Sequence, residues 1–256
     1  MTYTIDIAKV GSQEAPGPEV FFMDAFDDFL PLWFTMAIVR GEGRTIAINT
    51  GFEADVSHLV EGFPKWHPKA IFARTEDERV ERVLERLNVR ADDVDTVVLT
   101  PLGSYSSGNI SLFRRAQICL LRSGWGALLA PGPYAPDRPP TVALPKQELN
   151  YLLGDGWPRL RLLEDDDEVA PGIRTFFTGV HHPSSMAIAI PTAKGMAVYT
   201  DSSFYFRNVE DDIPVGIGRS LEEARRSYAR IRAVADLLIP AYDPAIFERY
   251  PGGRID

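Results

Sequence analysis

The side chains that most often bind transition metals, or act as nucleophiles and bases, are few in this sequence: His58, His67, Cys119, His181 and His182. Four histidines are a small number for a metalloenzyme of 256 residues. The single cysteine excludes a disulfide framework and a cysteine-rich zinc site, and it fits a reducing compartment. Cys119 lies in the apolar run 116–121, where it is best interpreted as a small core residue.

A polar loop over residues 101–109, with the sequence PLGSYSSGN, holds further candidates for chemistry. Ser106 and Ser107 with the following Gly-Asn could supply backbone donors for an oxyanion, although Gly-Asn is also ordinary turn chemistry. The loop follows the apolar run 95–100, which predicts a buried strand. A loop directly after such a strand is where α/β proteins present active-site residues.

The elements that position this loop are predicted from caps and periodicity. Thr75 with Glu78 forms a capping box before apolar residues at helical spacing, which predicts a helix over 75–87. A final helix is predicted from Ser220 to about residue 237, with Glu223 at its third position. Further strands are predicted at 34–39, 44–48, 116–121, 173–178, 186–190 and 196–200, and a short helix at 147–153. Strands dominate both halves with helices between them, so the pattern predicts a layered α/β sandwich.

Composition and charge limit the partners. Hydrophobic residues make up 45% of the chain and aromatic residues 11%, enough for a large core, which excludes a disordered or fibrous chain. The net charge of −9 argues against nucleic acid or an anionic membrane as the main partner. A small molecule is the expected substrate or ligand, and a homodimer stays open. The acidic run 164–168 allows an ion site, but a solvated turn is the favoured interpretation.

Location is predicted from the absence of targeting patterns. The N-terminus lacks a basic start followed by an apolar run, so no signal peptide is expected. The most apolar stretch, Phe29 to Val39, is about 11 residues long, too short for a bilayer, which needs about 20. The sequence therefore predicts a cytoplasmic protein.

Six short segments carry a family resemblance through their order along the chain: Ile46–Gly51 (IAINTG), Val94–Thr100 (VDTVVLT), Asp167–Gly172 (DEVAPG), Thr178–Pro183 (TGVHHP), Tyr199–Asp201 (YTD) and Ile239–Pro244 (IPAYDP). In this order they resemble the metallo-β-lactamase superfamily, and within it the N-acyl-homoserine lactonase-like branch, over about residues 30–250. The resemblance implies a four-layer αββα sandwich with its site at one edge of the two sheets. Residues 1–256 would form this one domain.

The chemistry of that family depends on two metal ions, which generate hydroxide and polarise the substrate carbonyl. Its ligands are a His-x-His-x-Asp-His loop, a later His, a bridging Asp and a last His. The resemblance keeps only the later His, as His181, and the bridging Asp, as Asp201. At the other ligand positions it places Pro101, Gly103, Tyr105, Ser106 and Tyr242.

These replacements are poor ligands. Proline and glycine offer no side-chain donor, and neutral serine and tyrosine bind zinc weakly beside imidazole and carboxylate. A stable site needs about three or four good ligands, so the resemblance implies a degenerate centre with no metal and no cofactor. Phe204 stands where the branch has a substrate-polarising Tyr, and Asn49 where the family has an Asp that supports the metal loop. Together these departures disfavour metal-dependent lactone hydrolysis.

The first hypothesis for function is a metal-independent enzyme that acts on a small, partly apolar molecule by hydrolysis or another acyl- or proton-transfer step. The family frame puts His181 and Asp201 on facing strand ends, where the carboxylate could hydrogen-bond the imidazole and raise its basicity. His181 would be the base and Asp201 its orienting partner. The nucleophile or acid would be one of Ser106, Tyr105 and Tyr242.

Four further residues are predicted to contact a substrate: His182, Phe204, Ser107 and Trp66. His182 adjoins His181, although neighbouring residues of a strand point to opposite faces. Trp66 lies in an aromatic stretch that could line an apolar pocket, the core or a subunit contact. A surface position is the favoured interpretation for His58 and His67.

The second hypothesis is a catalytically inactive homologue that serves as a binding or scaffolding protein, because a fold does not determine a function. The two hypotheses predict different structures. An open polar pocket with His181 and Asp201 in contact favours the enzyme. A pocket plugged by Tyr105, Tyr242 or the segment 63–66 favours the binding protein.

Overall fold

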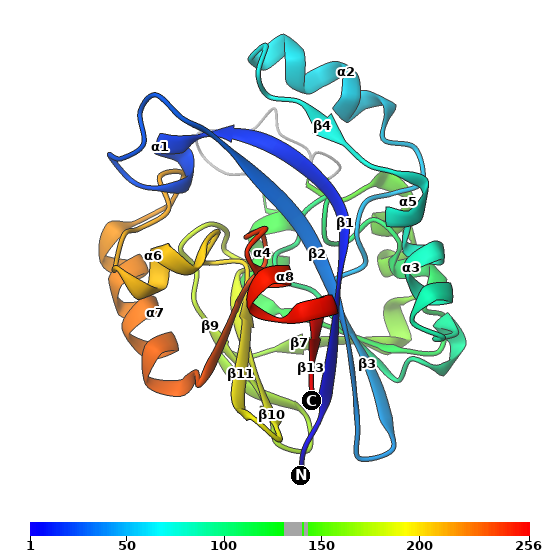
Figure 1. Ribbon diagram of the computed structural model, residues 1–256. Helices are drawn as coiled ribbons and strands as arrows, with labels where there is room; N and C mark the ends of the chain where they lie inside the picture. The colour runs from blue at the N-terminus through cyan, green and yellow to red at the C-terminus, as the bar shows by residue number, and fades with distance from the viewer. Residues whose placement is uncertain (131–139, 141–142) are drawn as a thin grey trace.

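The computed structural model describes residues 1–130, 140 and 143–256, and for Trp66 only the backbone. In this part of the chain the strands form two sheets (Figure 1). The eight-stranded sheet contains β1 (Thr4–Pro16), β2 (Phe29–Gly41), β3 (Arg44–Ile48), β4 (Phe72–Ala73), β5 (Thr96–Val98), β6 (Gln117–Leu121), β7 (Leu160–Leu163) and β13 (Arg254–Ile255). The five-stranded sheet contains β8 (Asp166–Ala170), β9 (Ile173–Phe177), β10 (Met186–Thr192), β11 (Gly195–Thr200) and β12 (Leu237–Pro240).

Helices cover the outer faces of the two sheets, as the four-layer αββα prediction requires. Figure 1 shows α6 and α7 on one side of the molecule, and α3 and α5 on the other. The helices are α1 (Gly17–Val20), α2 (Ser57–Trp66), α3 (Val80–Arg86), α4 (Arg122–Leu129), α5 (Lys146–Leu153), α6 (Phe206–Glu210), α7 (Leu221–Val234) and α8 (Ile246–Arg249). None of the described helices is both long and apolar enough to cross a membrane.

The order of strands puts the site loops at one edge of the sheets. The larger sheet has the order β13-β1-β2-β3-β5-β6-β7, and the smaller one β12-β11-β10-β9-β8. Strands β3, β5, β6 and β7 run parallel, so the loops at their carboxyl ends meet at one edge. The polar loop 101–109 leaves that edge, and so does the chain after β3.

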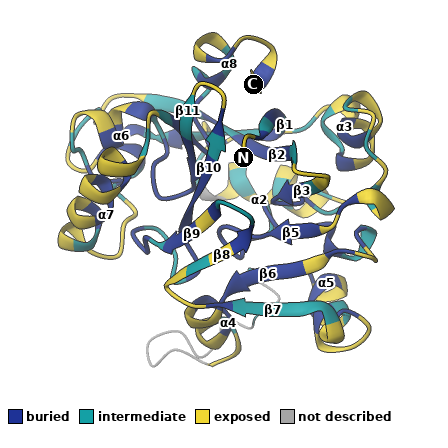
Figure 2. Ribbon diagram, turned by 90° about the horizontal axis from the view of Figure 1, so that it is seen from below, coloured by how far each residue is buried: buried dark blue, intermediate teal, exposed yellow. Residues whose placement is uncertain are grey.

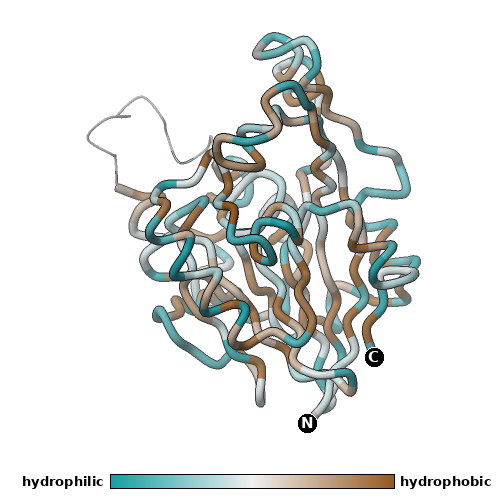
Figure 3. Tube along the Cα trace, turned by 60° about the vertical axis from the view of Figure 1, so that its left-hand side comes forward, coloured by the Kyte–Doolittle hydropathy of each residue, from teal (hydrophilic) through white to brown (hydrophobic). Residues whose placement is uncertain are grey.

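The core lies between the sheets and beneath the helices. Cys119 is fully buried in it, as the sequence indicates. Figure 2 shows buried strands with exposed residues on the outer faces of the helices, and Figure 3 shows hydrophobic residues along the interior strands. Thr35 of β2 connects the two sheets, since its hydroxyl donates to the Ala241 carbonyl at 2.8 Å.

Most predicted elements form near their expected positions. The hairpin between β2 and β3 turns through Glu42 and Gly43, with φ of 51° and 70°, the left-handed geometry that tight hairpins need. The capping box of Thr75 and Glu78 is present, but it caps a short 3-10 helix, Glu76–Glu78, that precedes α3. Ser220 caps α7 by accepting from the Glu223 backbone nitrogen at 3.2 Å.

Several features differ from the sequence-based expectation. The final helix, predicted to about residue 237, ends at Val234, and Leu237 begins β12. The pattern did not predict β1, because polar residues interrupt its alternation after a bulge between Lys9 and Gly11. The acidic run 164–168 is not simply a solvated turn, because its residues from Asp166 onward begin β8. Its carboxylates pair with arginines instead: Asp167 with Arg161 at 2.6 Å, Glu164 with Arg122 at 2.8 Å, and Asp166 with Arg230.

Close backbone packing at Gly108 gives a test of how the polar loop is held. A Cβ atom there would lie 2.1 Å from the Glu53 nitrogen and 2.3 Å from the Phe52 carbonyl carbon. Gly108→Ala should therefore lower the free energy of unfolding by roughly 1–3 kcal/mol or more. Gly126→Ala on α4 is the matched control, because no atom lies within 4 Å of its new Cβ. It should stabilise by about 0.5–1 kcal/mol. Equal effects of the two variants in denaturant unfolding would contradict this account.

Candidate functional site

Asn49 anchors the start of the polar loop. Its backbone takes a left-handed φ of 63°, which asparagine tolerates better than most residues. Its side-chain amide donates to the Thr100 carbonyl at 2.8 Å, and its side-chain oxygen accepts from the Thr100 nitrogen at 2.8 Å. An amide can serve both groups because it carries a donor and an acceptor. The residue at the family's supporting aspartate position thus still supports this loop.

The serines of the loop are engaged with the loop itself. Ser106 is buried, and its hydroxyl donates to the Pro101 carbonyl at 2.5 Å while lying 3.0 Å from the Gly103 carbonyl. Ser107 is fully buried, and its backbone nitrogen donates to the Gly103 carbonyl at 2.9 Å. These contacts close a turn over 101–107. They leave the Ser106 hydroxyl directed at carbonyl groups rather than at a base.

Asp201 is a fully buried carboxyl that joins the two site loops. One oxygen accepts from the Thr100 hydroxyl at 2.5 Å, and the other accepts from the Ser185 hydroxyl. Burial raises the pKa of Asp201 to about 7, although both hydrogen bonds act in the opposite direction. Sequence reasoning missed Thr100 and Ser185 as partners of this carboxyl. The only signal was their position, since Thr100 ends the predicted strand 95–100 and Ser185 directly precedes the predicted strand 186–190.

The second site loop, residues 178–185, carries His181 and His182 and has a strained backbone. Val180 has φ of 61°, a left-handed conformation that is an outlier for a β-branched residue. Its nitrogen donates to a Glu223 side-chain oxygen at 2.7 Å, and its carbonyl accepts from the Arg219 nitrogen at 2.6 Å. The N-terminal region of α7 therefore holds this loop in place.

His181 lies close to Asp201 without hydrogen-bonding it. The His181 Nδ1 atom is 4.0 Å from the Asp201 Oδ2 atom, and it is buried with no hydrogen-bond partner among the described residues. The predicted orienting hydrogen bond is thus absent at this distance, and the carboxyl oxygens accept from Thr100 and Ser185. Burial, and next the neighbouring His182, hold the pKa of His181 well below 6.5, so its ring is neutral at neutral pH.

Aromatic rings fill the space beside this pair. We call this set the aromatic cluster: Phe34, Phe52, Tyr105, Phe204 and Tyr242. Tyr105 packs against Tyr242 with ring centroids 5.9 Å apart, and Phe204 packs against Tyr242 at 5.0 Å and against His181 at 4.8 Å. Burial raises the pKa of both tyrosines, which are therefore neutral. Three of the predicted site residues thus meet here as packed rings.

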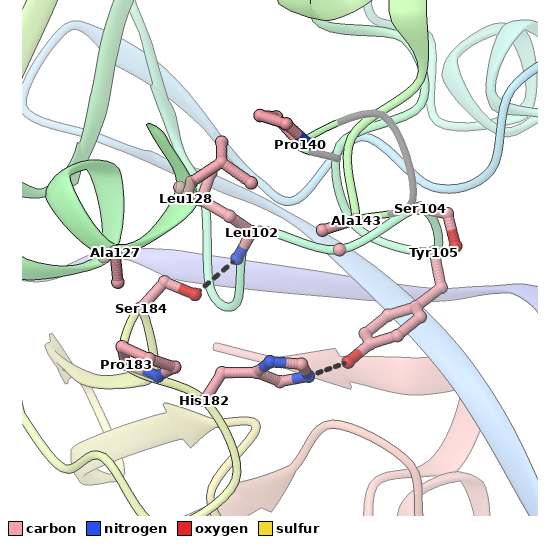
Figure 4. Close-up of a pocket in the computed structure, with 12 residues that line it drawn as sticks. Leu102, Ser104, Tyr105, Ala127, Leu128, Pro140, Ala143, His182, Pro183 and Ser184 are labelled. Atoms are coloured by element: carbon pink, nitrogen blue, oxygen red, sulfur yellow. Dashed lines mark hydrogen bonds between the residues drawn. The ribbon is translucent and has the colours of Figure 1, made fainter. Parts of the chain in front are cut away.

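A pocket of about 360 Å³ lies next to the aromatic cluster (Figure 4). The Tyr105 hydroxyl and the His182 Nε2 atom meet at its wall, 3.1 Å apart. The remaining lining is mostly apolar or small: Leu102, Gly103, Ser104, Gly124, Ala127, Leu128, Pro140, Ala143, Pro183 and Ser184. Burial, and next Arg219, lower the pKa of His182 to about 4, so this ring is also neutral at neutral pH.

The expectation that His182 points away from His181 does not hold. Strand β9 ends at Phe177, so residues 178–182 form a turn in which strand alternation does not apply. The two imidazole rings are 4.0 Å apart. Of the predicted substrate contacts, His182 lines the pocket, whereas Phe204 and Ser107 are buried elsewhere. The side chain of Trp66, at the end of α2, lies outside the described part of the structure.

The donor set does not fit the two-metal centre that the resemblance implies. No group of three or more His, Cys, Asp or Glu residues in the described ranges could hold a metal ion. Asp201 already has a hydrogen bond on each carboxyl oxygen, and the Tyr105 hydroxyl is bonded to His182. His181 and Asp201 alone fall short of the three or four ligands that such ions need.

Comparison with known proteins gives the family context of this geometry. The N-acyl homoserine lactonase of Bacillus cereus is 27% identical over 213 residues, which are 80% of this chain and 76% of that protein. A second lactonase, from a Bacillus species, is 26% identical over 240 residues, which are 90% of this chain and 83% of that protein. No protein-family model matches the chain.

Solved structures agree. An N-acyl homoserine lactone hydrolase with N-hexanoyl-L-homoserine bound at its catalytic metal centre superposes with a TM-score of 0.77 at 19% identity, covering 97% of both chains. The chain is a homologue of the N-acyl homoserine lactonases and has their metallo-β-lactamase fold. A probable metal-dependent hydrolase from Staphylococcus aureus has a TM-score of 0.73 at 15% identity, over 94% of this chain and 89% of the other.

Asn49 of this lactonase homologue can be tested by a change that keeps its size. Asn49→Asp removes the amide donor and turns a carboxylate oxygen toward the Thr100 carbonyl, while the left-handed backbone remains acceptable. The free energy of unfolding should fall by about 1–3 kcal/mol. The loss should shrink in acid, where a protonated carboxyl donates again. Asn88→Asp is the matched control, an exposed asparagine with φ of 52°. An equal loss at both positions would refute the anchoring role.

The raised pKa of Asp201 sets a pH dependence of stability. The carboxyl titrates near 3.8 when unfolded and near 7 when folded, so the folded state retains a proton between these values. The raised pKa of Asp201 therefore adds to the free energy of unfolding. This addition is full below pH 3.8 and is lost as the pH rises toward 7, by up to about 1.4 kcal/mol per pH unit.

Asp201→Asn should remove that slope when denaturant unfolding is measured from about pH 4 to 8. The buried histidines act in the opposite sense, but they are shared by both proteins and cancel in the difference. Asp92→Asn, at an exposed position, should keep the wild-type profile. A parallel profile for Asp201→Asn would show that this carboxyl is not the source of the slope.

Proposed function

We propose that this lactonase homologue binds a small, partly apolar molecule, without metal, in the pocket between loop 101–105 and residues 182–184. The observation that carries the proposal is the Tyr105–His182 hydrogen bond of 3.1 Å at the wall of a largely apolar pocket. It supplies a polar group where most of the lining is hydrocarbon, the usual composition of small-molecule sites. Assembly as a homodimer and location in the cytoplasm stay predictions from the sequence.

The aromatic cluster supports binding over two-metal hydrolysis. Tyr105 and Tyr242 stand at two ligand positions of the resemblance, and their rings pack at 5.9 Å instead of leaving room for ions. The tyrosines fill the positions of metal ligands in the resemblance, the arrangement expected of the binding protein, and the pocket lies beside them. The gap of 4.0 Å between His181 and Asp201 supports the same choice, because it leaves the imidazole without its orienting partner.

Neutrality of the polar groups indicates the kind of ligand. Tyr105 and His182 are both uncharged at neutral pH, since burial shifts each pKa toward the neutral form. Such a pair can donate to and accept from an amide, an ester or an alcohol without burying a net charge. Leu102, Leu128 and Ala143 give the apolar part of the molecule its contacts.

A second candidate is metal-independent hydrolysis in the same pocket, with His182 as the base in place of His181. It is favoured by the position of the His182 ring, which lines the pocket as a neutral imidazole. The imidazole would take a proton from water while the water oxygen adds to the ester or lactone carbonyl carbon. The acyl C–O bond then breaks, and the leaving oxygen receives that proton from the imidazolium.

Filling the pocket tests the binding proposal. Ala127→Phe adds a ring to the pocket wall on α4, and it should weaken binding of N-hexanoyl homoserine lactone more than tenfold in calorimetric titration. Leu129→Phe is the matched control, because Leu129 is exposed on the same helix outside the pocket lining. Binding should survive a chelator. One or two tightly held zinc or iron ions per chain, or equal effects of both variants, would sink the proposal.

His182→Gln separates the two candidates. Turnover of a lactone, ester or amide by the wild type that is abolished in this variant supports hydrolysis. Binding without turnover in the wild type supports the binding protein. His58→Gln, at an exposed histidine, serves as the control and should change neither quantity.

A further inference from the structure

Helix α7 and the residues just before it contact the second site loop at three points. The Ser227 hydroxyl donates to the Thr178 carbonyl at 2.7 Å. The Val180 nitrogen donates to the Glu223 carboxylate at 2.7 Å, and the Val180 carbonyl accepts from the Arg219 nitrogen at 2.6 Å. Hydrogen bonds to a carboxylate are roughly twice as strong as neutral ones, so we expect the Glu223 contact to contribute most.

The Glu223 contact stabilises a turn that is unfavourable for one of its residues. Gly179 and Val180 both have φ of 61°, in the left-handed region, where a β-branched valine is strained. Glycine carries no such strain. A Cβ atom at position 179 would lie only 2.4 Å from the Glu223 Oε1 atom. Gly179 therefore leaves space for the carboxylate, and the carboxylate offsets the strain at Val180.

His182 lies between two anchored residues of this loop. On one side, Val180 is bonded to α7. On the other side, the Ser185 hydroxyl accepts from the His182 nitrogen at 3.1 Å and donates to Asp201. The His182 ring then meets the Tyr105 hydroxyl at the pocket wall, 3.1 Å away (Figure 4). Because Val180 is two residues from His182, the position of this ring depends on the turn at Val180.

We propose that Glu223 is a positioning residue of the pocket, which through the Val180 backbone holds the His182 ring in the wall beside Tyr105. The inference rests on the proposed function of the pocket. Glu223 is not among the described residues that line the pocket, so it acts through the loop backbone. Loss of its hydrogen bond should therefore release His182 without removing a group that contacts the ligand.

Four variants separate the hydrogen bond from the charge. Glu223→Ala removes both. Glu223→Gln removes the charge but keeps an oxygen that accepts from Val180, and its NH2 group can face water because the Glu223 side chain is 22% exposed. Glu223→Asp keeps the charge but is one methylene shorter, so its carboxylate should fall short of the Val180 nitrogen. Glu222→Ala is the matched control, because that side chain is 80% exposed and pairs with Arg226 on the same helix.

Binding of N-hexanoyl homoserine lactone is the first readout, measured by calorimetric titration. The affinity should fall about fivefold to tenfold in Glu223→Ala, and in the same direction in Glu223→Asp, because the ring of His182 is no longer held in the wall. Glu223→Gln and Glu222→Ala should bind within about twofold of the wild type.

Titration of His182 is the second readout, and a general loss of stability would not move it. Burial, and next Arg219, hold the pKa of His182 at about 4, and the adjacent His181 ring is also neutral at neutral pH. In Glu223→Ala the released ring meets water, which should raise this pKa toward 6.5. Glu223→Gln leaves the ring buried and removes a carboxylate 3.9 Å from Arg219, so its His182 pKa should not rise. NMR of ring-labelled histidine measures the titration, with the signal assigned through His182→Gln.

Each failure has its own signature. Unchanged binding and unchanged His182 titration in Glu223→Ala would overturn the positioning role while the proposed function stands. A fall in affinity without the rise in the His182 pKa would assign Glu223 to the fold alone, and an equal fall in Glu223→Gln would assign the effect to charge; both overturn the proposal. Should Glu223→Ala fail to fold, Glu223→Asp gives the same two readouts. If the wild type does not bind the lactone, the proposed function fails, whereas the titration still decides whether Glu223 holds the ring.

Discussion

The buried carboxyl of Asp201 is the contact on which the site depends. One oxygen accepts from Thr100, which follows β5 of the larger sheet. The other accepts from Ser185, which directly precedes β10 of the smaller sheet. One side chain thus connects the two loops that carry Tyr105, Ser106, His181 and His182. In a two-metal enzyme, shared ligation of ions could provide this connection. Here hydroxyl groups provide it, at the cost of a carboxyl kept in a nonaqueous environment.

The aromatic cluster completes this replacement. A metal centre is a polar region that must be solvated by its ligands, whereas packed phenyl and phenol rings remove the same volume from water. Phe34 joins the cluster from β2, with its ring 5.0 Å from Tyr105 and 5.5 Å from Tyr242. The hydrophobic core therefore extends to this edge of the sandwich. The pocket lies beside the aromatic cluster.

Much of the fold could be predicted from the sequence, because the capping box at Thr75, the cap at Ser220 and the short apolar strands are local signals. The strand β1 could not, since its polar positions pair within the sheet and no local pattern reports that pairing. In the site, the family resemblance placed His181, Asp201, Tyr105 and Tyr242 in one region, and ring contacts and the 4.0 Å His181–Asp201 approach join them. The hydrogen bonds that Asp201 accepts from two hydroxyls could not be predicted. Thr100 is about one hundred positions away from Asp201 in the sequence, and the loop that carries Ser185 contains the unusual backbone turn at Val180.

Gly103 has a consequence for the order in which this site can change. A Cβ atom at this position would come within 3.0 Å of the Tyr105 ring, so the glycine and the tyrosine are mutually adapted. Restoring a histidine at 103 first would push against the phenol, and the ring would have to move before an imidazole could enter. A larger side chain at 103 therefore requires the Tyr105 ring to move, so changes at these two positions depend on each other.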